Sequence, residues 1–390
     1  MRGSGLPLLV VRAGRSDIDA IGSALDVLRP AALAVSLTDF SVISDARILS
    51  ARHSVPFATD PVLHRMALPG YEARPGMRKL SYRPPDGNGP WTPSDLVARS
   101  RDISERVVEE QHLAAAGVVF AAAVAVRDPA DPAINAIGPL LSGSILASSA
   151  WGDAPVIAPV VCHIARFRAE AEQMALVQAL GTSAPQCWLL LFDAVRANSM
   201  PATMLAAARL INRLRARGAP VLVGRAGPSR RLWLALGADG VEIGLGRLEH
   251  FSLAEQGTGH RGPGHHPPRW EVPELLCSLP HSLARELMRS ASLQPCLCPT
   301  CAQAMSEHER LAGTVTHNAW VVESDLRHAS GLSVAQRRAS LLESLSHARS
   351  CALSLAEVTG LMRHLRHLWT WPDVVRLVDE QLQEDAERAA

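Results

Sequence analysis

Lysine and aromatic residues are nearly missing from this chain of 390 residues. Lys79 is its only lysine, so arginine supplies almost all of the positive charge. The planar fork of arginine suits phosphate groups, but acidic residues balance it to a net charge of +1, so the overall charge neither favours nor excludes a nucleic-acid partner. Aromatic residues make up only 4%, which leaves few faces for stacking on bases. The candidates for such stacking are Trp151, Trp188, Trp233, Phe251 and Trp270.

Long hydrophobic runs are also missing. The apolar stretches 114–126 and 156–162 are shorter than the ~20 residues that a membrane-spanning helix needs. The apolar run 6–11 is too short for a secretory signal, and no small-residue cleavage site follows it. The seven cysteines are odd in number and three are clustered, which fits a reducing compartment better than a secreted disulfide scaffold. We therefore expect a cytoplasmic protein that does not contact membranes.

The most specific motif is a cluster of three cysteines, Cys296, Cys298 and Cys301. Cysteines this close do not pair in unstrained disulfides, but three thiolates and a histidine can bind one tetrahedral Zn²⁺. Both His317 and His328 lie downstream and are candidates for the fourth ligand. Such a closed site is typical of structural zinc, and a reduced cysteine-rich turn or a redox-active thiol pair is the alternative. The other cysteines are scattered and are interpreted as ordinary buried residues: Cys162, Cys187, Cys277 and Cys351.

Residues 1–255 alternate short apolar runs with longer helical patterns. The predicted strands are 8–11, 32–37, 118–126, 155–161, 188–192, 220–224 and 240–243. The predicted helices are 16–28, 92–116, 165–180, 202–217 and 229–236. Near-continuous apolar strands between helices indicate a parallel sheet. Seven or eight such units favour an α/β fold of the (β/α)₈ TIM-barrel type, and no Gly-x-Gly-x-x-Gly follows the first strand to suggest a dinucleotide site.

The remaining residues divide into three predicted regions. Residues 256–290 are a Gly/His/Pro-rich loop and linker, in which His260, His265 and His266 are interpreted as solvated rather than metal-binding. Residues 291–330 form the zinc-binding lobe. Residues 331–390 form a helical C-terminal segment, with predicted helices 333–348, 355–371 and 372–387.

A Cys-x-Cys-x-x-Cys cluster after a (β/α)₈ barrel, followed by the dipeptide His317-Asn318, resembles the tRNA-guanine transglycosylase (queuine/archaeosine tRNA-ribosyltransferase) family. The barrel unit that opens with Thr92-Pro93-Ser94-Asp95 is similar to the same pattern. So is the segment 237–242, which matches a Gly-x-Asp-x-x-Asp stretch of the family. The Asp-Ser-Gly-Gly-Phe element and the Gly-rich base-recognition segments of the family are absent, and such departures resemble divergent members that act on DNA or accessory subunits.

The resemblance implies a set of site residues. It favours His317 as the fourth metal ligand over His328, which fits the spacing of the family better but lacks the neighbouring asparagine. Glu242 matches the nucleophilic aspartate, and Asp239 takes that place if the register shifts. Asp60 is the preferred second acid, ahead of Asp39 and Asp45. The implied substrate-binding residues, which follow predicted strands, are Asp128, Asp193 and His163. Each acid also has a simpler interpretation as a helix cap or salt-bridge partner.

The reaction implied is exchange of guanine in tRNA or DNA for a 7-deazaguanine base, with a carboxylate nucleophile and a second carboxyl group that handles protons. Zn²⁺ is expected to be structural, and a homodimer or heterodimer is compatible with the family. Four arginines near the expected barrel mouth are candidates for phosphate contacts or for a solvated surface: Arg225, Arg230, Arg231 and Arg247. The alternatives are a catalytically inactive zinc-containing subunit that binds nucleic acid or an active partner, and an unrelated barrel enzyme with an incidental zinc.

Overall fold

The computed structural model describes residues 7–14, 18–71, 74–85, 89–152, 154–193, 195–196, 199–245, 251, 253, 269–289, 296–304, 306–355, 357–358 and 360–389. Three histidines of the Gly/His/Pro-rich stretch, His260, His265 and His266, lie outside these ranges. Arg247 lies outside them too.

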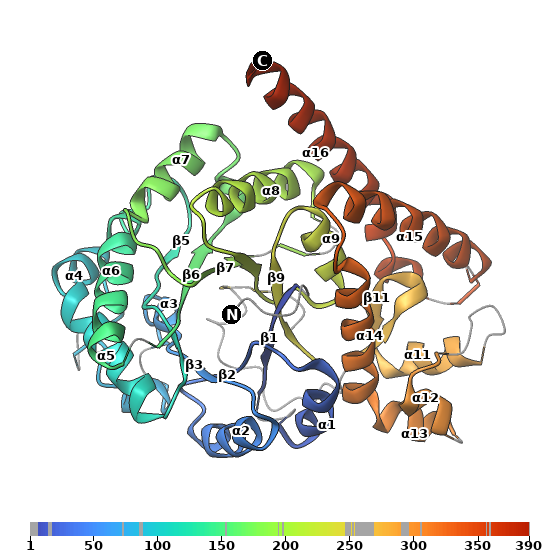
Figure 1. Ribbon diagram of the computed structural model, residues 1–390, viewed down its shortest axis with the longest axis horizontal. Coiled ribbons are helices and arrows are strands. Elements are labelled where there is room, and N and C mark those ends of the chain that lie inside the picture. The colour runs from blue at the N-terminus through green and yellow to red at the C-terminus, as the bar shows by residue number, and fades with distance from the viewer. Residues whose placement is uncertain are drawn as a thin grey trace.

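Eight parallel strands of the described chain close into a barrel, which Figure 1 shows end-on. In order around the ring they are β1 (Leu8–Arg12), β2 (Ala32–Ser36), β3 (Phe57–Asp60), β4 (Val118–Phe120), β6 (Val156–Cys162), β7 (Cys187–Phe192), β8 (Val221–Val223) and β9 (Gly240–Gly244). Pairing of β9 with β1 closes the ring, and the two-residue β5 (Ala125–Val126) extends the pairing of β6. Nearly all strand residues are buried, because side chains fill the barrel on one side and helices cover the other. The predicted TIM-type barrel is confirmed.

Helices surround the barrel in chain order. They are α1 (Ile18–Leu28), α2 (Phe40–His53), α5 (Ser100–Leu113), α6 (Ile134–Ala150), α7 (Glu170–Ala179), α8 (Pro201–Arg215) and α9 (Arg230–Ala235). Short elements lie between them: α3 (Leu63–Met66), η1 (Met77–Lys79), α4 (Pro93–Ala98), η2 (Ile164–Arg166) and η3 (Gly227–Ser229). Thr92 caps α4 in a capping box with Asp95, as predicted, but the single helix expected over 92–116 is divided at Arg99 into α4 and α5.

After β9 the chain leaves the barrel, builds a lobe and then returns. The lobe contains an antiparallel hairpin and three helices: β10 (Trp270–Val272), η4 (Pro273–Leu275), β11 (Cys277–Leu279), α11 (His281–Met288), α12 (Pro299–Gln303) and α13 (Glu307–Ala312). The next helix, α14 (Thr314–Ala329), packs against both α1 and α9, and so it takes the place of the last helix of the barrel ring (Figure 1). Part of the predicted linker 256–290 is therefore regular structure.

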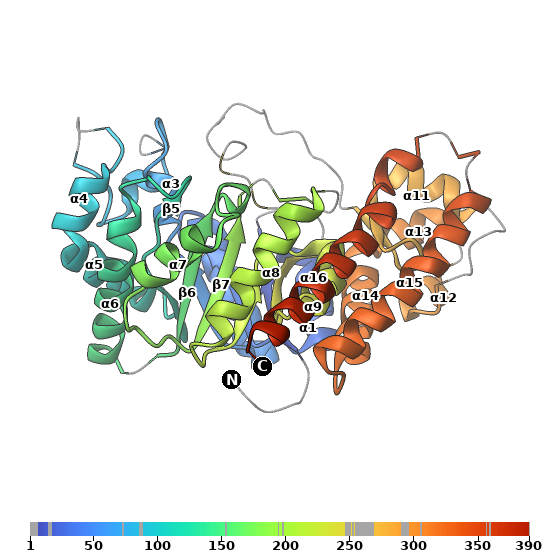
Figure 2. The same cartoon turned by 90° about the horizontal axis from the view of Figure 1, so that it is seen from above.

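The C-terminal segment packs back on the barrel helices. The helix α15 (Val334–Ser354) contacts α9, and α16 (His367–Ala389) crosses α8, as the side view shows (Figure 2). The expected helix over 355–371 is wrong: Gly360 adopts a left-handed φ of 81° and interrupts it, and only η5 (Met362–His364) precedes α16. The boundary expected at Pro372 is also wrong, since α16 runs through it. No helix of the described residues is long and apolar enough to span a membrane.

Candidate metal centre and barrel-mouth site

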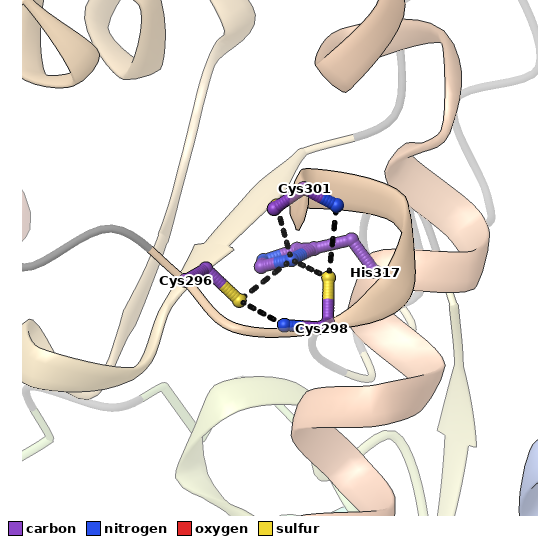
Figure 3. A group of neighbouring side chains, drawn as sticks. All are labelled: Cys296, Cys298, Cys301 and His317. Carbon is purple, nitrogen blue, oxygen red and sulfur yellow. Dashed lines mark hydrogen bonds between the residues drawn. The ribbon is translucent and has the colours of Figure 1, made fainter. Parts of the chain in front are cut away.

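The three clustered cysteines and His317 converge on one point (Figure 3). The Nδ1 atom of His317 lies 3.5 Å from the sulfur of Cys296, 3.4 Å from that of Cys298 and 3.5 Å from that of Cys301. A tetrahedral zinc with ordinary bond lengths separates its nitrogen and sulfur ligands by about 3.5 Å. The four donor atoms, all within 4.8 Å of one another, therefore have the spacing of a Cys₃His metal site.

Local backbone contacts orient the sulfur atoms. Cys298 is the N-cap of α12 and its sulfur accepts the backbone N–H of Cys301 at 3.4 Å, while the sulfur of Cys296 accepts the N–H of Cys298 at 3.5 Å. Pro299 at the first helical position fixes the start of this helix. Hydrogen bonds from Cys296 and then Cys301 lower the pKa of the Cys298 thiol. Thiolates are the form that binds a metal.

His317 is held in the tautomer that a metal ligand needs. Its Nε2 donates to the backbone carbonyl of Glu271 at 2.8 Å, which leaves Nδ1 with its lone pair toward the sulfurs. The indole of Trp270 stacks on the imidazole, with ring centroids 3.7 Å apart. His328 lies elsewhere, with its Nε2 2.5 Å from the hydroxyl of Ser340, so the structure brings together the histidine that the sequence favoured. Trp270 is thereby used in the lobe rather than for base stacking.

Asn318 ties the lobe to the end of the last barrel strand. Its side-chain amide donates to the carbonyls of Leu245 and Arg269, both at 2.8 Å, and accepts the N–H of Glu271 at 3.1 Å. The side chain is buried, so water does not replace these bonds. His317 and Asn318 are adjacent on α14, so this helix supplies both a metal ligand and the side chain that holds the lobe to the end of β9.

We expect Asn318→Ala to destabilise the protein by about 2–3 kcal/mol, because it leaves buried backbone groups without partners. Denaturant unfolding measures the change. Ser344→Ala, which removes only a bond between a helix hydroxyl and the carbonyl of Ser340, is the control and should cost much less. Equal losses of stability in both variants would contradict the role of Asn318 in holding the lobe to the end of β9.

At the C-terminal ends of the barrel strands, Arg12 joins the two predicted catalytic acids. Its guanidinium lies 2.8 Å from the carboxylate of Asp60 on β3 and forms an ion pair with Glu242 on β9. All three side chains are buried, and Glu242 is 0% exposed. Burial alone would raise the pKa of Asp60, but the positive charge of Arg12 opposes it and the pKa falls to about 2. The sequence thus named both carboxylates, and both pair with the same cation, Arg12, which the sequence analysis did not name.

Two more buried groups lie beside the triad of Arg12, Asp60 and Glu242. Arg225, which follows β8, has its Nε 3.9 Å from the same Glu242 oxygen. Burial, and then repulsion by Arg12, lowers the pKa of Arg225 to about 9, so it is still charged at neutral pH. Burial also lowers the pKa of His64 to about 3, which keeps this imidazole neutral. The far oxygen of Glu242, Oε2, has no hydrogen-bond partner among the described residues.

The predicted substrate-binding residues form a separate arrangement. His163 and Asp193, at the ends of β6 and β7, face each other with Nδ1 and Oδ2 3.4 Å apart, and the other oxygen of Asp193 accepts the N–H of Leu253 at 2.8 Å. Asp128 is exposed, and its carboxylate accepts the backbone N–H of Ala130 at 2.9 Å. Asp128 therefore closes a local turn.

The alternative nucleophile Asp239 lies at the wrong end of the barrel. It directly precedes β9, and its carboxylate contacts Arg215 at 3.1 Å and the backbone N–H of Val221 at 3.0 Å. These contacts are at the N-terminal ends of β8 and β9, opposite the mouth. Glu242 is the acid of this segment that the structure places beside Asp60 and Arg12.

The mouth arginines named from the sequence have different surroundings. Arg230 pairs with Glu271 at 2.7 Å and with Asp325, and Arg231 pairs with Asp325. Arg230 therefore connects α9 to both the lobe and α14, and Arg231 connects α9 to α14. Neither the phosphate interpretation nor the solvated-surface interpretation holds for Arg230. Arg12 could have been found from its position, since a charged residue that ends a buried parallel strand lies at a barrel mouth.

The fold and site define this chain as a (β/α)₈-barrel protein with a Cys₃His group in a C-terminal lobe. No protein-family model matches the sequence, and no curated protein matches it in sequence. Among solved structures it is similar to the 3-dehydroquinate dehydratase from Aquifex aeolicus VF5, with 10% identity over 64% of this chain and 95% of that one at a TM-score of 0.32. An enolase protein from environmental shotgun sequencing of the Sargasso Sea shares 12% identity over 61% of this chain and 54% of that one at a TM-score of 0.30. Likenesses this distant carry no argument about activity.

Proposed function

We propose that the protein exchanges a guanine base in a nucleic acid for a 7-deazaguanine, by means of the carboxylates of Glu242 and Asp60. The observation that carries the proposal is the joining of these two acids by Arg12: Arg12 and Asp60 end β1 and β3, and Glu242 is the middle residue of β9. Active sites of (β/α)₈ enzymes lie at the C-terminal ends of the barrel strands. The Cys₃His group, formed by the residues that carry the transglycosylase resemblance, supports the same interpretation.

The two carboxylates have distinct roles in this reaction. Glu242 would attack C1′ of the nucleoside as the guanine leaves, and the incoming base would then attack the same carbon and release the carboxylate. The unpartnered Oε2 is the oxygen available for this attack, because Oε1 is engaged by Arg12. Once it has taken up a proton from solvent in the bound complex, Asp60 would donate that proton to the leaving guanine and would regain one from the incoming base. Arg12 would keep Asp60 ionised before the base is bound.

The lobe would serve the reaction as a rigid support. A Cys₃His site with no open position is structural in most proteins, and zinc is the metal that this donor set favours. Glu271 links the two parts, because its carbonyl accepts the Nε2–H of His317 while its carboxylate pairs with Arg230 of α9. Binding of the metal would therefore fix the lobe against the barrel. The metal takes no part in the base exchange.

Exchange of labelled guanine into tRNA and into duplex DNA tests the proposal. We expect Glu242→Gln to reduce exchange by at least about 100-fold, since even small displacements of a reacting group cost on this scale. Asp60→Asn should reduce it as well. Asp239→Asn is the matched control, because this acid lies at the opposite end of the barrel. Exchange that persists in Glu242→Gln but is lost in Asp239→Asn would reject Glu242 as the nucleophile.

A second candidate function is a catalytically inactive subunit that binds nucleic acid or pairs with an active partner. The complete burial of Glu242 favours it, as does the tight packing of Gly224, where an added Cβ would lie 2.7 Å from Oε2 of Glu242. A substrate sugar reaches this carboxylate only if the mouth rearranges. The same assay discriminates between the two: no exchange by the wild type on either nucleic acid, in a protein that retains its metal, favours the subunit.

A further inference from the structure

A cleft of about 280 Å³ opens at the C-terminal ends of β7 and β8. One wall comes from the barrel, at Phe192 and at Val223 to Arg225, and another from the hairpin residues Cys277 and Ser278. The segment around η5 and the start of α16 closes the third side. Its size is near the lower end of the roughly 300–1,000 Å³ that is usual for small-ligand sites.

The lining of this cleft is strongly cationic. Five arginines line it and supply the positive charge, because burial lowers the pKa of its two histidines, His364 and His367. No aspartate or glutamate appears among its described lining residues. The arginines are Arg196, Arg225, Arg269, Arg363 and Arg366. The whole chain has a net charge of only +1, so its composition does not explain why these arginines gather in one cleft. A concave site of one charge attracts ligands of the opposite charge.

Arg225 shows that the positive charge at this cleft is incompletely neutralised. Its side chain is 7% exposed, and its Nη1 has no hydrogen-bond partner among the described residues. Its nearest carboxylate, Glu242, is 3.9 Å from Nε and is already paired with Arg12. The backbone of Arg225 has a φ of 56°, in the left-handed region that an arginine rarely adopts and that is common at binding sites.

The inner wall of the cleft is aromatic. Phe192 and Trp233 lie with ring centroids 5.5 Å apart, and Phe251 joins them in the lining. A ligand that fits both parts therefore carries an anion together with an apolar or planar portion. In (β/α)₈ barrels the loops after the seventh and eighth strands frequently bind phosphate, and this cleft lies beside β8, the seventh strand of the ring.

We propose that the cleft between the barrel mouth and the C-terminal segment binds the phosphate group of a nucleotide, with the base or sugar against the aromatic wall. Arginine provides the bidentate fork that phosphate oxygens prefer. The nucleotide is either free or part of a strand, since both present the same chemistry to the cleft. This inference goes beyond base exchange, and it would hold for an inactive subunit too.

Calorimetric titration of the whole protein with guanosine 5′-monophosphate, guanosine and a single-stranded oligonucleotide tests this proposal. We expect the phosphorylated probes to bind and guanosine to bind at least about tenfold more weakly, because the charge-assisted bonds are then lost. The double variant Arg363→Glu/Arg366→Glu should weaken binding of the phosphorylated probes by a similar factor. Both side chains are exposed, so the fold should tolerate the change.

The control is Arg376→Glu, an exposed arginine on α16 that is absent from the described cleft lining. Binding of guanosine 5′-monophosphate without the oligonucleotide identifies a free nucleotide, and competition between the two identifies a strand; either supports the proposal. Equal binding of guanosine, binding unchanged in the double variant, or no binding by either phosphorylated probe would overturn it. Because exchange is not measured, these outcomes are independent of the Glu242 test.

Discussion

A His317→Ala variant is expected to lose the bound metal and the fold of the lobe around α12, while the barrel remains folded. Structural zinc in small domains contributes on the order of 10–16 kcal/mol of binding free energy, which is larger than any single packing contact supplies. The lobe has little else to replace it, because α12 is only five residues long and follows the metal ligands directly. Metal analysis of purified protein should give about one zinc per chain for the wild type and almost none for the variant.

Hydrogen exchange shows where the effect falls. We expect faster exchange in 296–304 and at the hairpin strand β10, whose Glu271 carbonyl loses its bond to the imidazole. Exchange in β1 and β9 should change little. Cys351→Ser is the control, because Cys351 lies on α15 outside the metal group, with its sulfur 3.5 Å from Nε2 of His347. A His317→Ala protein that keeps one metal per chain would contradict the ligand assignment.

An Arg12→Met variant is expected to lose about 3–5 kcal/mol of stability at neutral pH. The substitution preserves much of the volume but leaves the carboxylates of Asp60 and Glu242 buried without their shared cation. Arg225 offsets only part of this loss, and mainly at Glu242, whose carboxylate lies 3.9 Å from its Nε. Denaturant unfolding at pH 7 measures the loss. Arg12→Lys keeps one charge without the fork that reaches both acids, so its loss should be intermediate.

The pH dependence of the same variants gives a second measure of the triad. In the wild type the pKa of Asp60 is about 2, below its unfolded value, so this residue contributes stability above about pH 4 that is lost as the pH falls toward 2. The contribution is about 2 kcal/mol. Without Arg12, burial raises the pKa of Asp60, so the loss of stability in the variant should shrink as the pH falls and this acid protonates. If the difference in free energy of unfolding between variant and wild type stays constant from pH 7 to 4, the pairing of Arg12 with the two buried acids is contradicted.

Much of the fold could be predicted from local pattern, and the misses have local causes. Strand β3 is only four residues long and ends in Asp60, so it lacks the apolar run that marked the other strands. Helix α6 contains Pro139 and two glycines, which favour a loop in sequence. Gly138 is needed there because a Cβ would lie 2.6 Å from the carbonyl of Ala179. A contact with a neighbouring helix, rather than helix propensity, explains this residue.

The candidate site was predicted where its residues are close in sequence or match a motif. The cysteines are separated by one and two residues, so their convergence follows from the backbone, and the tertiary structure selected His317 because α14 turns it toward β10. The buried acids Asp60 and Glu242 were both named, but Arg12 was not, since its position at the end of a strand indicates the barrel mouth without showing which acids it meets. The cationic cleft was not anticipated, because Arg363 and Arg366 are more than a hundred residues from Arg225.

The sequence by itself determined the order of strands and helices and the spacing of the thiols, because both depend on contacts between neighbours along the chain. Only the tertiary structure decided which charges meet. Closure of the barrel brings the ends of all its strands to one mouth, and the return of the chain after β9 adds the C-terminal arginines to it. These contacts between charged side chains depend on the register of distant strands and on the packing of α16 against α8, which no local pattern encodes.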